Sequence, residues 1–393
     1  MPDPLRVGLV AGEASGDTLG AALIESLRVL DPRARFFGIA GPKMRAAGCE
    51  QWEPSESLAL MGLFEILAEL PRLVRLRARV RRAFIGARPD VFVGIDAPEF
   101  NLGLARRLRA AGIPSVQYVS PQVWAWRRGR VRGMREAVDL VLCLLPFEKP
   151  FYDEHGLRAR FVGHPLADQI PLKVDRAAAR AALGLAADAR VVALLPGSRR
   201  GEVRRLGPDF AATVRWLAAR RPDLVFIAPM ANGAVDGIFR AALGAFADAG
   251  VGATPATVRL IDGRAREALI AADVALVTSG TASLEAALCK CPMVVVYRLT
   301  ALTAWVLRRF KLVKSPYFAQ PNLLAQRRLV GEYFQDDIVP ESIGAELLMW
   351  LDDAPRRAEL IEEFTAIHAS LRLDASTSAA RAIAELLGRA GSA

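Results

Sequence analysis

Two acidic residues stand where short apolar runs give way to loops, which is where α/β proteins hold reactive groups. Asp96 directly follows the run VFVGI, and Glu13 follows an apolar run that begins at Leu5. Apolar neighbours raise the pKa of a carboxylate at a strand end, which makes it a fit general base. We therefore take Asp96 as the first candidate for the base, with Glu13 and Glu99 as rivals. A plain helix cap is the alternative role for Asp96.

The loop around Glu13, AGEASGD, is rich in glycine and other small residues. Its glycines allow the backbone to approach a ligand closely, and Ser15 and Asp17 are able to cap the helix expected after them. The loop lacks the GxGxxG spacing of dinucleotide-binding proteins, and no acidic residue ends the second apolar run near Phe37. The pattern disfavours a dehydrogenase and leaves two interpretations, a ligand-binding loop or a tight turn with a cap.

Two further loops have the features of a diphosphate site. In PGSRRGEV, Ser198 exposes a backbone N–H group and Arg199 offers a two-pronged guanidinium. In TSGTASLE, Gly280 and Thr281 open a helix whose positive end favours phosphate oxygens, and Glu285 is placed to accept both hydroxyls of a ribose. Together these loops favour a nucleoside diphosphate. The absence of a GxxxxGK[ST] motif argues against the usual NTPase site.

The sequence is poor in metal ligands. It has three histidines and neither a DxD nor an HExxH motif. We therefore expect no metal and no cofactor, with Arg199 and helix N-termini neutralising the phosphates that leave. His164, in GHP, either lines a site or has a structural role. The four cysteines are too few for a disulfide framework, and Cys289 and Cys291 lack the partners of a zinc site.

A strongly apolar stretch is followed directly by a basic one. Residues 58–70 (LALMGLFEILAEL) are apolar at helical spacing, and residues 72–88 hold seven arginines and no acid. Apolar surface beside arginine fits an element that docks on anionic lipid, and residues 305–314 repeat the mixture. The alternative is a core helix with a solvated basic face. The residues expected to dock are Met61, Leu63, Phe64, Ile66, Leu67, Arg72 and Arg75.

These candidate residues need a framework that brings strand ends together. Short apolar runs alternate with stretches of helical spacing, which predicts an α/β fold with mostly parallel sheets covered on both faces. The pattern lapses after His164 and begins again near residue 191. We expect two Rossmann-like, doubly wound domains facing a cleft. The strands are expected at residues 5–10, 36–40, 91–95, 115–119, 140–144 and 160–162, and then at 191–195, 224–228, 257–261, 274–277 and 293–297.

Length and composition agree with this division. The chain has 393 residues, and at about 150 residues per domain two domains are expected. The boundaries predicted are 1–170 for the first domain, which carries the apolar and basic stretch, 171–340 for the second domain, which carries the two diphosphate loops, and 341–393 for a helical tail. No uncharged apolar run reaches the roughly 20 residues that cross a bilayer, and the first residues do not have the pattern of a signal peptide. The expected location is therefore cytoplasmic.

Short blocks along the chain resemble, in order, the lipid-A-disaccharide synthase family. They are GEASGD, AGPKM, MGLFEIL, GIDAPEFN, YVSPQVWAWR, LPFEKPFY, GHP, LLPGSR, SGTASLE, KCPMVVVYR and PNLLA. The resemblance runs to about Arg328 and implies a glycosyltransferase of the GT-B architecture. It implies UDP-2,3-diacylglucosamine as donor and 2,3-diacylglucosamine 1-phosphate (lipid X) as acceptor, joined β(1→6) with inversion and release of UDP. It also implies a Gram-negative enzyme of lipid A biosynthesis, peripheral on the inner face of the inner membrane.

The resemblance also assigns roles to single residues. It implies that Asp96 takes the proton of the acceptor hydroxyl. It also implies that Glu13, Ser15 and Gly16 line the acceptor side of the site. The residues that match UDP-side positions are Ser198, Arg199, Gly280, Thr281, Glu285 and, in PNLLA, Asn322. A homodimer whose subunits exchange their C-terminal tails is implied as well.

Two other functions fit parts of the pattern. A UDP-sugar 2-epimerase has the same fold, but it needs no lipid acceptor and leaves the apolar and basic stretches without a role. A non-enzymatic basic protein that binds RNA would account for the net charge of +10 but not for two diphosphate loops. Binding of UDP separates the RNA-binding protein from both enzymes. A requirement for a lipid acceptor separates the transferase from the epimerase.

Overall fold

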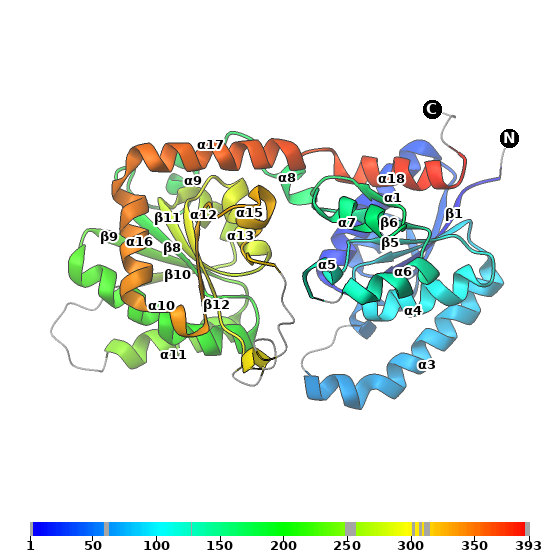
Figure 1. Ribbon diagram of the computed structural model, residues 1–393, viewed down its shortest axis with the longest axis horizontal. Helices are drawn as coiled ribbons and strands as arrows, with labels where there is room; N and C mark the ends of the chain where they lie inside the picture. Colours follow the sequence, from blue (N-terminus) through cyan, green and yellow to red (C-terminus); the bar gives the residue numbers. More distant parts are fainter. Residues whose placement is uncertain are drawn as a thin grey trace. The chain divides into compact units, whose positions relative to one another are not determined.

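The computed structural model divides the chain into two compact units (Figure 1). Unit 1 comprises Met1–Asp168 and Leu371–Ala393, and unit 2 comprises Gln169–Ser370. The structure describes residues 3–58, 63–126, 128–247, 257–300, 303–305, 309 and 315–389. The first boundary lies close to the predicted one at residue 170.

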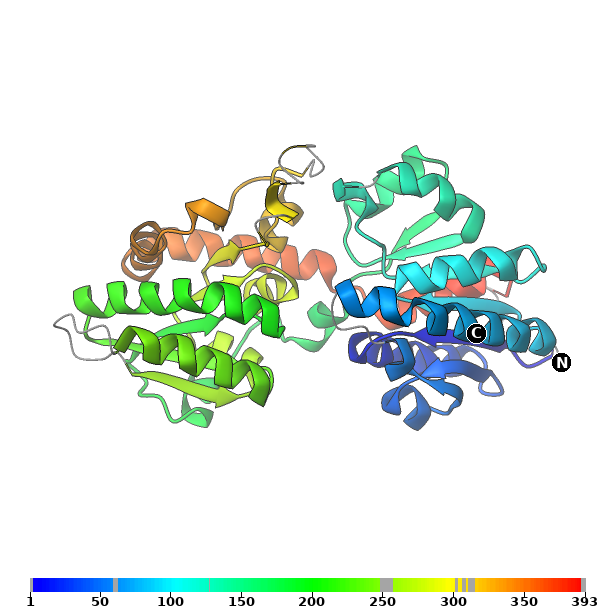
Figure 2. The ribbon, with the colours of Figure 1, turned by 90° about the horizontal axis from the view of Figure 1, so that it is seen from below.

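Unit 1 contains a parallel sheet of seven strands in the order β3-β2-β1-β4-β5-β6-β7. The strands are β1 (Arg6–Ala11), β2 (Arg35–Ala40), β3 (Cys49–Pro54), β4 (Val91–Ile95), β5 (Ser115–Tyr118), β6 (Leu140–Cys143) and β7 (Ala159–Phe161). Helices cover both faces of the sheet, as Figures 1 and 2 show. They are α1 (Ala14–Leu30), α2 (Pro42–Ala46), α3 (Leu63–Ala87), α4 (Pro98–Arg109), α5 (Val123–Trp126), α6 (Val131–Ala137), α7 (Glu148–Glu154), α8 (Pro165–Gln169) and α18 (Ala375–Leu386).

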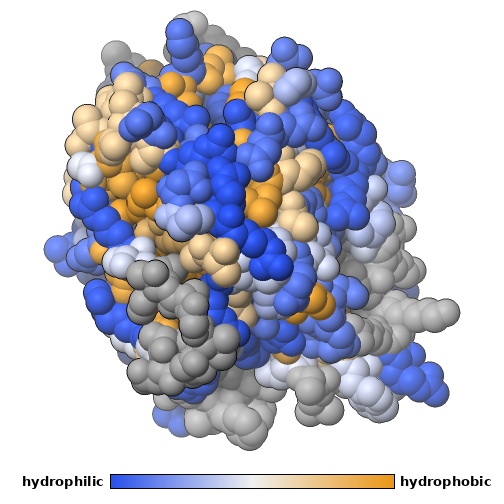
Figure 3. Space-filling model, turned by 90° about the vertical axis from the view of Figure 1, so that its left-hand side faces the viewer, coloured by the Kyte–Doolittle hydropathy of each residue, from blue (hydrophilic) through white to orange (hydrophobic). Residues whose placement is uncertain are grey.

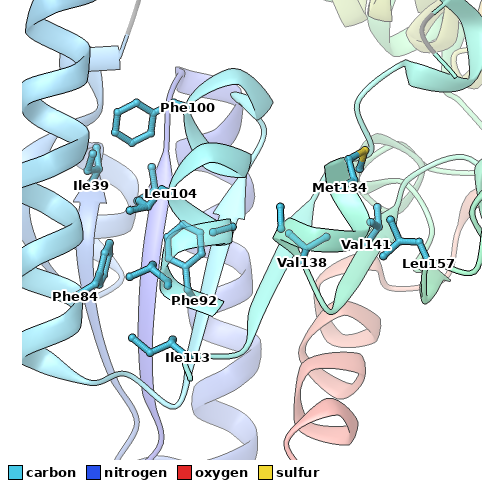
Figure 4. Packing of buried hydrophobic residues seen from close by; sticks show 14 of the residues in the cluster. Ile39, Phe84, Phe92, Phe100, Leu104, Ile113, Met134, Val138, Val141 and Leu157 are labelled. Atoms are coloured by element: carbon cyan, nitrogen blue, oxygen red, sulfur yellow. The ribbon is translucent and has the colours of Figure 1, made fainter. Parts of the chain in front are cut away.

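The sequence of β4 explains why this sheet is covered twice. Successive side chains of a strand point to opposite faces, and the five residues VFVGI are all buried. Val91, Val93 and Ile95 join a cluster with α1 and α18, whereas Phe92 joins one with α3, α4 and α6. Figure 4 shows Phe92 beside Phe84 of α3 within that second cluster. A strand with apolar residues on both faces is stable only between two helical layers.

Unit 2 repeats the plan with six parallel strands in the order β10-β9-β8-β11-β12-β13. The strands are β8 (Arg190–Leu195), β9 (Leu224–Met230), β10 (Val258–Asp262), β11 (Val274–Thr278), β12 (Met293–Tyr297) and β13 (Gly331–Phe334). The helices are α9 (Arg176–Ala182), α10 (Arg200–Arg220), α11 (Gly233–Ala247), α12 (Ala265–Ala271), α13 (Thr281–Leu288), α15 (Gln320–Ala325), α16 (Pro340–Asp352) and α17 (Ala354–Leu371). On the face shown in Figure 3, hydrophobic side chains are interspersed with hydrophilic ones, as on ordinary globular proteins.

The C-terminal region is helical, as expected, but residues 341–393 do not form a separate part. Helix α16 packs against α10 of unit 2, and α18 packs against α1 of unit 1 in the same chain. The Asp168 carboxylate accepts hydrogen bonds from the backbone nitrogens of Asp374 (3.0 Å) and Ala375 (2.7 Å), which begins α18. The tail returns to unit 1 because its small apolar residues complete the core on that face of the sheet.

His164 lies in the same crossing region and has a structural role. Its backbone nitrogen donates to the carbonyl oxygen of Leu371 (2.8 Å), and its Nδ1 accepts from the nitrogen of Leu166 (3.2 Å). Burial lowers the pKa of this imidazole to about 4, so the ring is neutral at physiological pH. These contacts favour a structural role for His164 over a place in a ligand site.

Candidate active site

The chain order of the strands reverses between β1 and β4, which are neighbours in unit 1. In doubly wound sheets, ligands bind beyond the carboxyl ends of the strands at such a reversal. The last residues of β1 and β4 are paired in register, so the loops that carry Glu13 and Asp96 begin side by side. The loops also touch, since a Cβ on Gly12 would lie only 2.8 Å from the Cβ of Ala97. The two acidic candidates thus share one end of the sheet.

The backbone of Asp96 is held in a strained turn. Asp96 and Ala97 have φ angles of 52° and 40°, a region that is costly for residues with a side chain. Asn101 Nδ2 donates to the Asp96 carbonyl oxygen at 2.8 Å, and Gln117 Nε2 donates to the same oxygen at 3.0 Å. Both of these amide side chains are buried. Such over-determined strain is typical of functional loops.

The three acidic candidates differ in their surroundings. The Asp96 side chain is half-buried, and burial raises its pKa above the usual value, as the sequence predicted. Glu13 is exposed and begins α1 without a side-chain cap. Glu99 is exposed and forms an ion pair with Arg130 at 2.8 Å. Of the three, Asp96 alone combines burial with a fixed backbone.

The rest of the AGEASGD loop is only partly as expected. Ser15 is exposed on the first turn of α1, and Gly16 is buried against the end of β4. The prediction that Ser15 or Asp17 caps α1 is wrong, because no side chain caps that helix. Asp17 instead accepts hydrogen bonds from the backbone nitrogens of Lys43 and Met44, at 2.9 Å each, and so caps α2. This partner is distant in sequence and could not be read from the loop alone.

Unit 2 has the same reversal of strand order between β8 and β11, and each of these strands is followed by one of the two loops predicted to bind a diphosphate. Ser198 and Arg199 are exposed directly before α10. The Arg199 guanidinium lies 3.5 Å from the carboxylate of Glu202, and its side chain is 78% exposed. A long contact at the surface is worth little. The guanidinium is therefore able to turn toward an anion at the helix N-terminus.

The second loop presents its backbone in a similar way. Gly280 has a φ angle of 144°, which a residue with a side chain rarely adopts, and Thr281 is exposed at the start of α13. Glu285, one turn into α13, is partly buried, and its carboxylate lies 3.5 Å from the guanidinium of Arg266. The arrangement places an exposed helix N-terminus and a carboxylate one turn apart.

Asn322 is placed differently from the sequence-based expectation of a UDP-side contact. It is fully buried in α15, and its Oδ1 accepts from the nitrogens of Leu329 (2.7 Å) and Val330 (3.0 Å). Its Nδ2 donates to the carbonyl oxygen of Val330 at 2.9 Å. These bonds hold the loop that enters β13. The amide of Asn322 is thus engaged by its own chain, which favours a positioning role.

Sequence reasoning missed two buried polar residues near the carboxyl end of unit 1's sheet. Gln117 lies in β5 and is 1% exposed, and Glu148 begins α7 and is 3% exposed. Burial raises the pKa of the Glu148 carboxyl to about 7. A glutamine within a strand and a glutamate at a helix start are both common as solvent-facing residues. No local signal therefore marked them.

The predicted docking element is only partly described. Met61 lies outside the described residues, and so do the side chains of Leu63, Phe64, Ile66 and Leu67 at the start of α3. Further along α3, one face contributes Leu73, Leu76, Val80 and Phe84 to the core. Arg72, Arg75, Arg79 and Arg82 line a groove on the helix. From Arg72 onward, α3 is a core helix with a basic outer face, which is the alternative that the sequence left open.

In the described part of the chain, no helix is long and apolar enough to cross a membrane. No group of three or more His, Cys, Asp or Glu in the described ranges is placed to hold a metal ion. Cys49, Cys143, Cys289 and Cys291 are buried and free of disulfide bonds. The absence of a metal from the reaction stays a prediction.

Solved structures with similar folds include both transferases and an epimerase. The calicheamicin glycosyltransferase CalG4 has a TM-score of 0.59 and 17% identity over 99% of this chain and 100% of that one. The UDP-GlcNAc 2-epimerase from Neisseria meningitidis, bound to UDP-GlcNAc, has a TM-score of 0.61 and 13% identity over 98% of this chain and 100% of that one. At such low identity these likenesses show the fold alone, which is the two-domain fold of GT-B glycosyltransferases.

Sequence comparison is more decisive. A family model described as Lipid-A-disaccharide synthetase matches residues 7–385. The lipid-A-disaccharide synthase of Pseudomonas aeruginosa (strain UCBPP-PA14) is 52% identical over 389 residues, covering 99% of this chain and 100% of that protein. That of Serratia proteamaculans (strain 568) is 49% identical over 383 residues, covering 98% of each. With this identity along both whole chains, the chain belongs to the lipid-A-disaccharide synthase family.

Proposed function

We propose that the chain transfers 2,3-diacylglucosamine from UDP to the 6-hydroxyl of 2,3-diacylglucosamine 1-phosphate. The products are lipid A disaccharide 1-phosphate and UDP. The observation that carries the mechanism is the strained, half-buried Asp96 at the strand reversal of unit 1. Its carboxylate accepts the hydroxyl proton as that oxygen attacks the anomeric carbon. The bond from this carbon to the diphosphate oxygen breaks, and a single displacement inverts the anomeric centre to give a β(1→6) link.

The acceptor contacts are assigned to the loop beside Asp96. Glu13 and Ser15 are exposed there, and both are available to hydrogen-bond sugar hydroxyls. Gly16 is buried beside them against the end of β4, where a Cβ would lie in ordinary van der Waals contact with Ala11 and Ile95. If Asp96 is not the base, Glu13 is the next candidate, since their two loops touch.

The donor contacts are assigned to the two loops of unit 2. Arg199 and the backbone of Ser198 would bind the diphosphate at the N-terminus of α10. Gly280 and Thr281 would offer backbone N–H groups at the N-terminus of α13, and Glu285 would accept hydrogen bonds from the ribose hydroxyls. The long Arg266 contact of Glu285 supports this role, because a 3.5 Å ion pair is easily exchanged for hydrogen bonds to a ligand.

We infer that the departing UDP is stabilised by protein groups and not by a metal ion. A guanidinium and two helix N-termini supply positive charge where negative charge develops. Activity should therefore survive EDTA. Loss of activity in EDTA, with recovery on addition of Mg²⁺, would contradict a metal-free mechanism.

We propose that the enzyme works on the cytoplasmic face of the inner membrane as a peripheral protein. Each substrate has two acyl chains, and returning a buried CH₂ group to water costs about 0.8 kcal/mol, so the enzyme has to reach them in the bilayer. The arginine-lined groove of α3 supports docking on anionic head groups, and Leu70 and Val74 on the same helix are exposed.

One assay separates this function from its alternatives. Purified enzyme is given diacylated UDP-glucosamine with and without lipid X, and UDP release and disaccharide are measured. Equal amounts of UDP and disaccharide, formed only with lipid X, are the expected result. An epimerase would convert the donor without the acceptor. An RNA-binding protein would leave both substrates unchanged.

A further inference from the structure

A buried carboxylate lies near the carboxyl end of unit 1's sheet, outside the roles assigned above. Glu148 Oε1 accepts a hydrogen bond from the indole nitrogen of Trp124 at 3.2 Å, and Oε2 accepts from the backbone nitrogen of Leu145 at 3.1 Å. Trp124 packs edge-on against Phe147, with ring centroids 4.8 Å apart. One side chain therefore ties α7 to the segment after β5.

We call that segment, residues 119–124, the β5 exit loop. Its first residue, Val119, has a φ angle of 73°, which is strained for a β-branched side chain. The Ser120 hydroxyl lies 2.8 Å from the hydroxyl of Tyr152, which itself donates to the carbonyl oxygen of Pro121 (3.4 Å). The loop is thus held by α7 at two points, at Ser120 through Tyr152 and at Trp124 through Glu148.

The same loop is connected to the proposed base. Gln117 Nε2 donates to the carbonyl oxygens of Asp96 (3.0 Å) and Val119 (3.3 Å). The backbone nitrogen of Asp96 donates to the carbonyl oxygen of Tyr118 at 2.9 Å. The turn that carries Asp96 and the start of the β5 exit loop therefore share hydrogen bonds. A shift of the loop would disturb both the acceptor side and the base.

We propose that Glu148 is a positioning residue for the acceptor and that it holds the β5 exit loop beside Asp96 through Trp124. The inference rests on the proposed acceptor site in unit 1. Two donors converge on the carboxylate, the indole nitrogen of Trp124 and the backbone nitrogen of Leu145. An ionised carboxylate accepts both bonds, whereas a protonated one competes as a donor. The holding contact is therefore strongest when Glu148 is charged.

The surroundings set the pH at which this contact changes. Burial raises the pKa of Glu148 to about 7. The titratable groups that face it are the Cys143 thiol of β6 and the Tyr152 phenol of α7, and burial raises the pKa of both, so both stay neutral. Lys149, the next residue in α7, is paired with Asp153 at 2.5 Å. The contact should thus be complete above pH 7 and weaken as the pH falls through 7.

The test is kinetic, with Glu148→Gln and the matched control Glu154→Gln, an exposed glutamate on the same helix. Wild-type kcat/KM for lipid X should rise through a step near pH 7. E148Q should lack this step and show a KM for lipid X roughly tenfold higher at pH 8, because a charge-assisted bond is lost. UDP affinity should be unchanged, and E154Q should match the wild type.

A second variant keeps the test decisive if E148Q fails to fold. Trp124→Phe removes one donor to the carboxylate while keeping an aromatic ring, so the step should move to higher pH. A step that E148Q retains, or that W124F leaves in place, would overturn the inference. Wild-type enzyme without any transfer to lipid X would instead overturn the proposed function. The two failures are therefore distinguishable.

Discussion

The side-chain nitrogen of Asn101 lies 2.8 Å from the carbonyl oxygen of Asp96, five residues earlier in the chain. Asn101 is completely buried in α4. A Cβ added to Gly94 would lie only 2.7 Å from the Cβ of Asn101, so Asn101 packs directly on β4. The amide therefore holds the backbone of the proposed base and leaves the carboxylate free for substrate. The orientation of the Asp96 side chain therefore depends on this contact.

Replacing Asn101 with Asp should test this dependence. The new side chain has nearly the same shape, but it places an acceptor against the Asp96 carbonyl and turns an attraction into a repulsion. We expect kcat to fall by roughly tenfold to a hundredfold, since small misplacements of a reactive group have effects of this size. UDP affinity, measured by titration, should not change.

The matched control for N101D is Asn232→Asp in unit 2. Asn232 accepts a hydrogen bond from the nitrogen of Val235 at the start of α11, a role that aspartate fills equally well. Its kinetics should match the wild type. Unchanged kcat in N101D, or a parallel loss of UDP affinity, would contradict the link between Asn101 and the base.

Asp96→Asn should remove the base while leaving donor binding intact. Turnover should fall by roughly 10² to 10⁴, the usual range for a lost general base. In the wild type, kcat/KM should fall on the acid side as Asp96 becomes protonated. Burial raises its pKa, so this limb should lie above the usual range of an aspartate. A mutant with near wild-type turnover would shift the role to Glu13, and E13Q would then be the variant to measure.

Most of the strands could be predicted because their signal is local. The run expected at 91–95 is β4, and that at 293–297 is β12. The two missed strands, β3 (CEQWEP) and β13 (GEYF), are the outermost strands at one edge of each sheet. An edge strand has a solvated side and carries charged residues, so it gives no continuous apolar run. Its place is decided by the neighbouring strand.

The loops of the candidate site could be located from the sequence for a similar reason. The loops after β1, β4, β8 and β11 stood out because small residues directly follow apolar runs. The residues that hold these loops, Gln117 and Glu148, could not be identified from the sequence, because they meet their partners only once the order of the strands is set. Asn322 is the opposite case, and its contact with UDP stays a prediction. It lies in a block that matches the family, yet its burial and bonds place it behind the loop before β13.

Arg199→Ala should weaken UDP binding and turnover together. Its guanidinium would contact the diphosphate in the ground state and oppose the charge that grows as UDP leaves. A lost charge-assisted bond corresponds to roughly tenfold to a hundredfold weaker binding. The loss should be larger for UDP than for UMP. Arg204→Ala, an exposed arginine on the same helix, is the control, and an equal loss there would point to a general effect of charge.

The double variant R72A/R75A should weaken docking on anionic membranes. Both arginines are exposed on α3 and line its groove, so their loss should leave the melting temperature nearly unchanged. Each basic residue near an anionic surface contributes about 1 kcal/mol, so two should change vesicle partitioning by roughly thirtyfold. Co-sedimentation with anionic vesicles should fall, and that with neutral vesicles should not.

The activity of the R72A/R75A enzyme should also depend on the membrane surface. With substrates embedded in anionic vesicles the R72A/R75A enzyme should be slower than the wild type, whereas with substrates dispersed in detergent the two should be equal. The control R132A/R204A removes two exposed arginines from other helices and the same total charge. If the control loses as much vesicle binding, net charge and not the face of α3 is responsible. If R72A/R75A binds anionic vesicles as the wild type does, this groove does not dock.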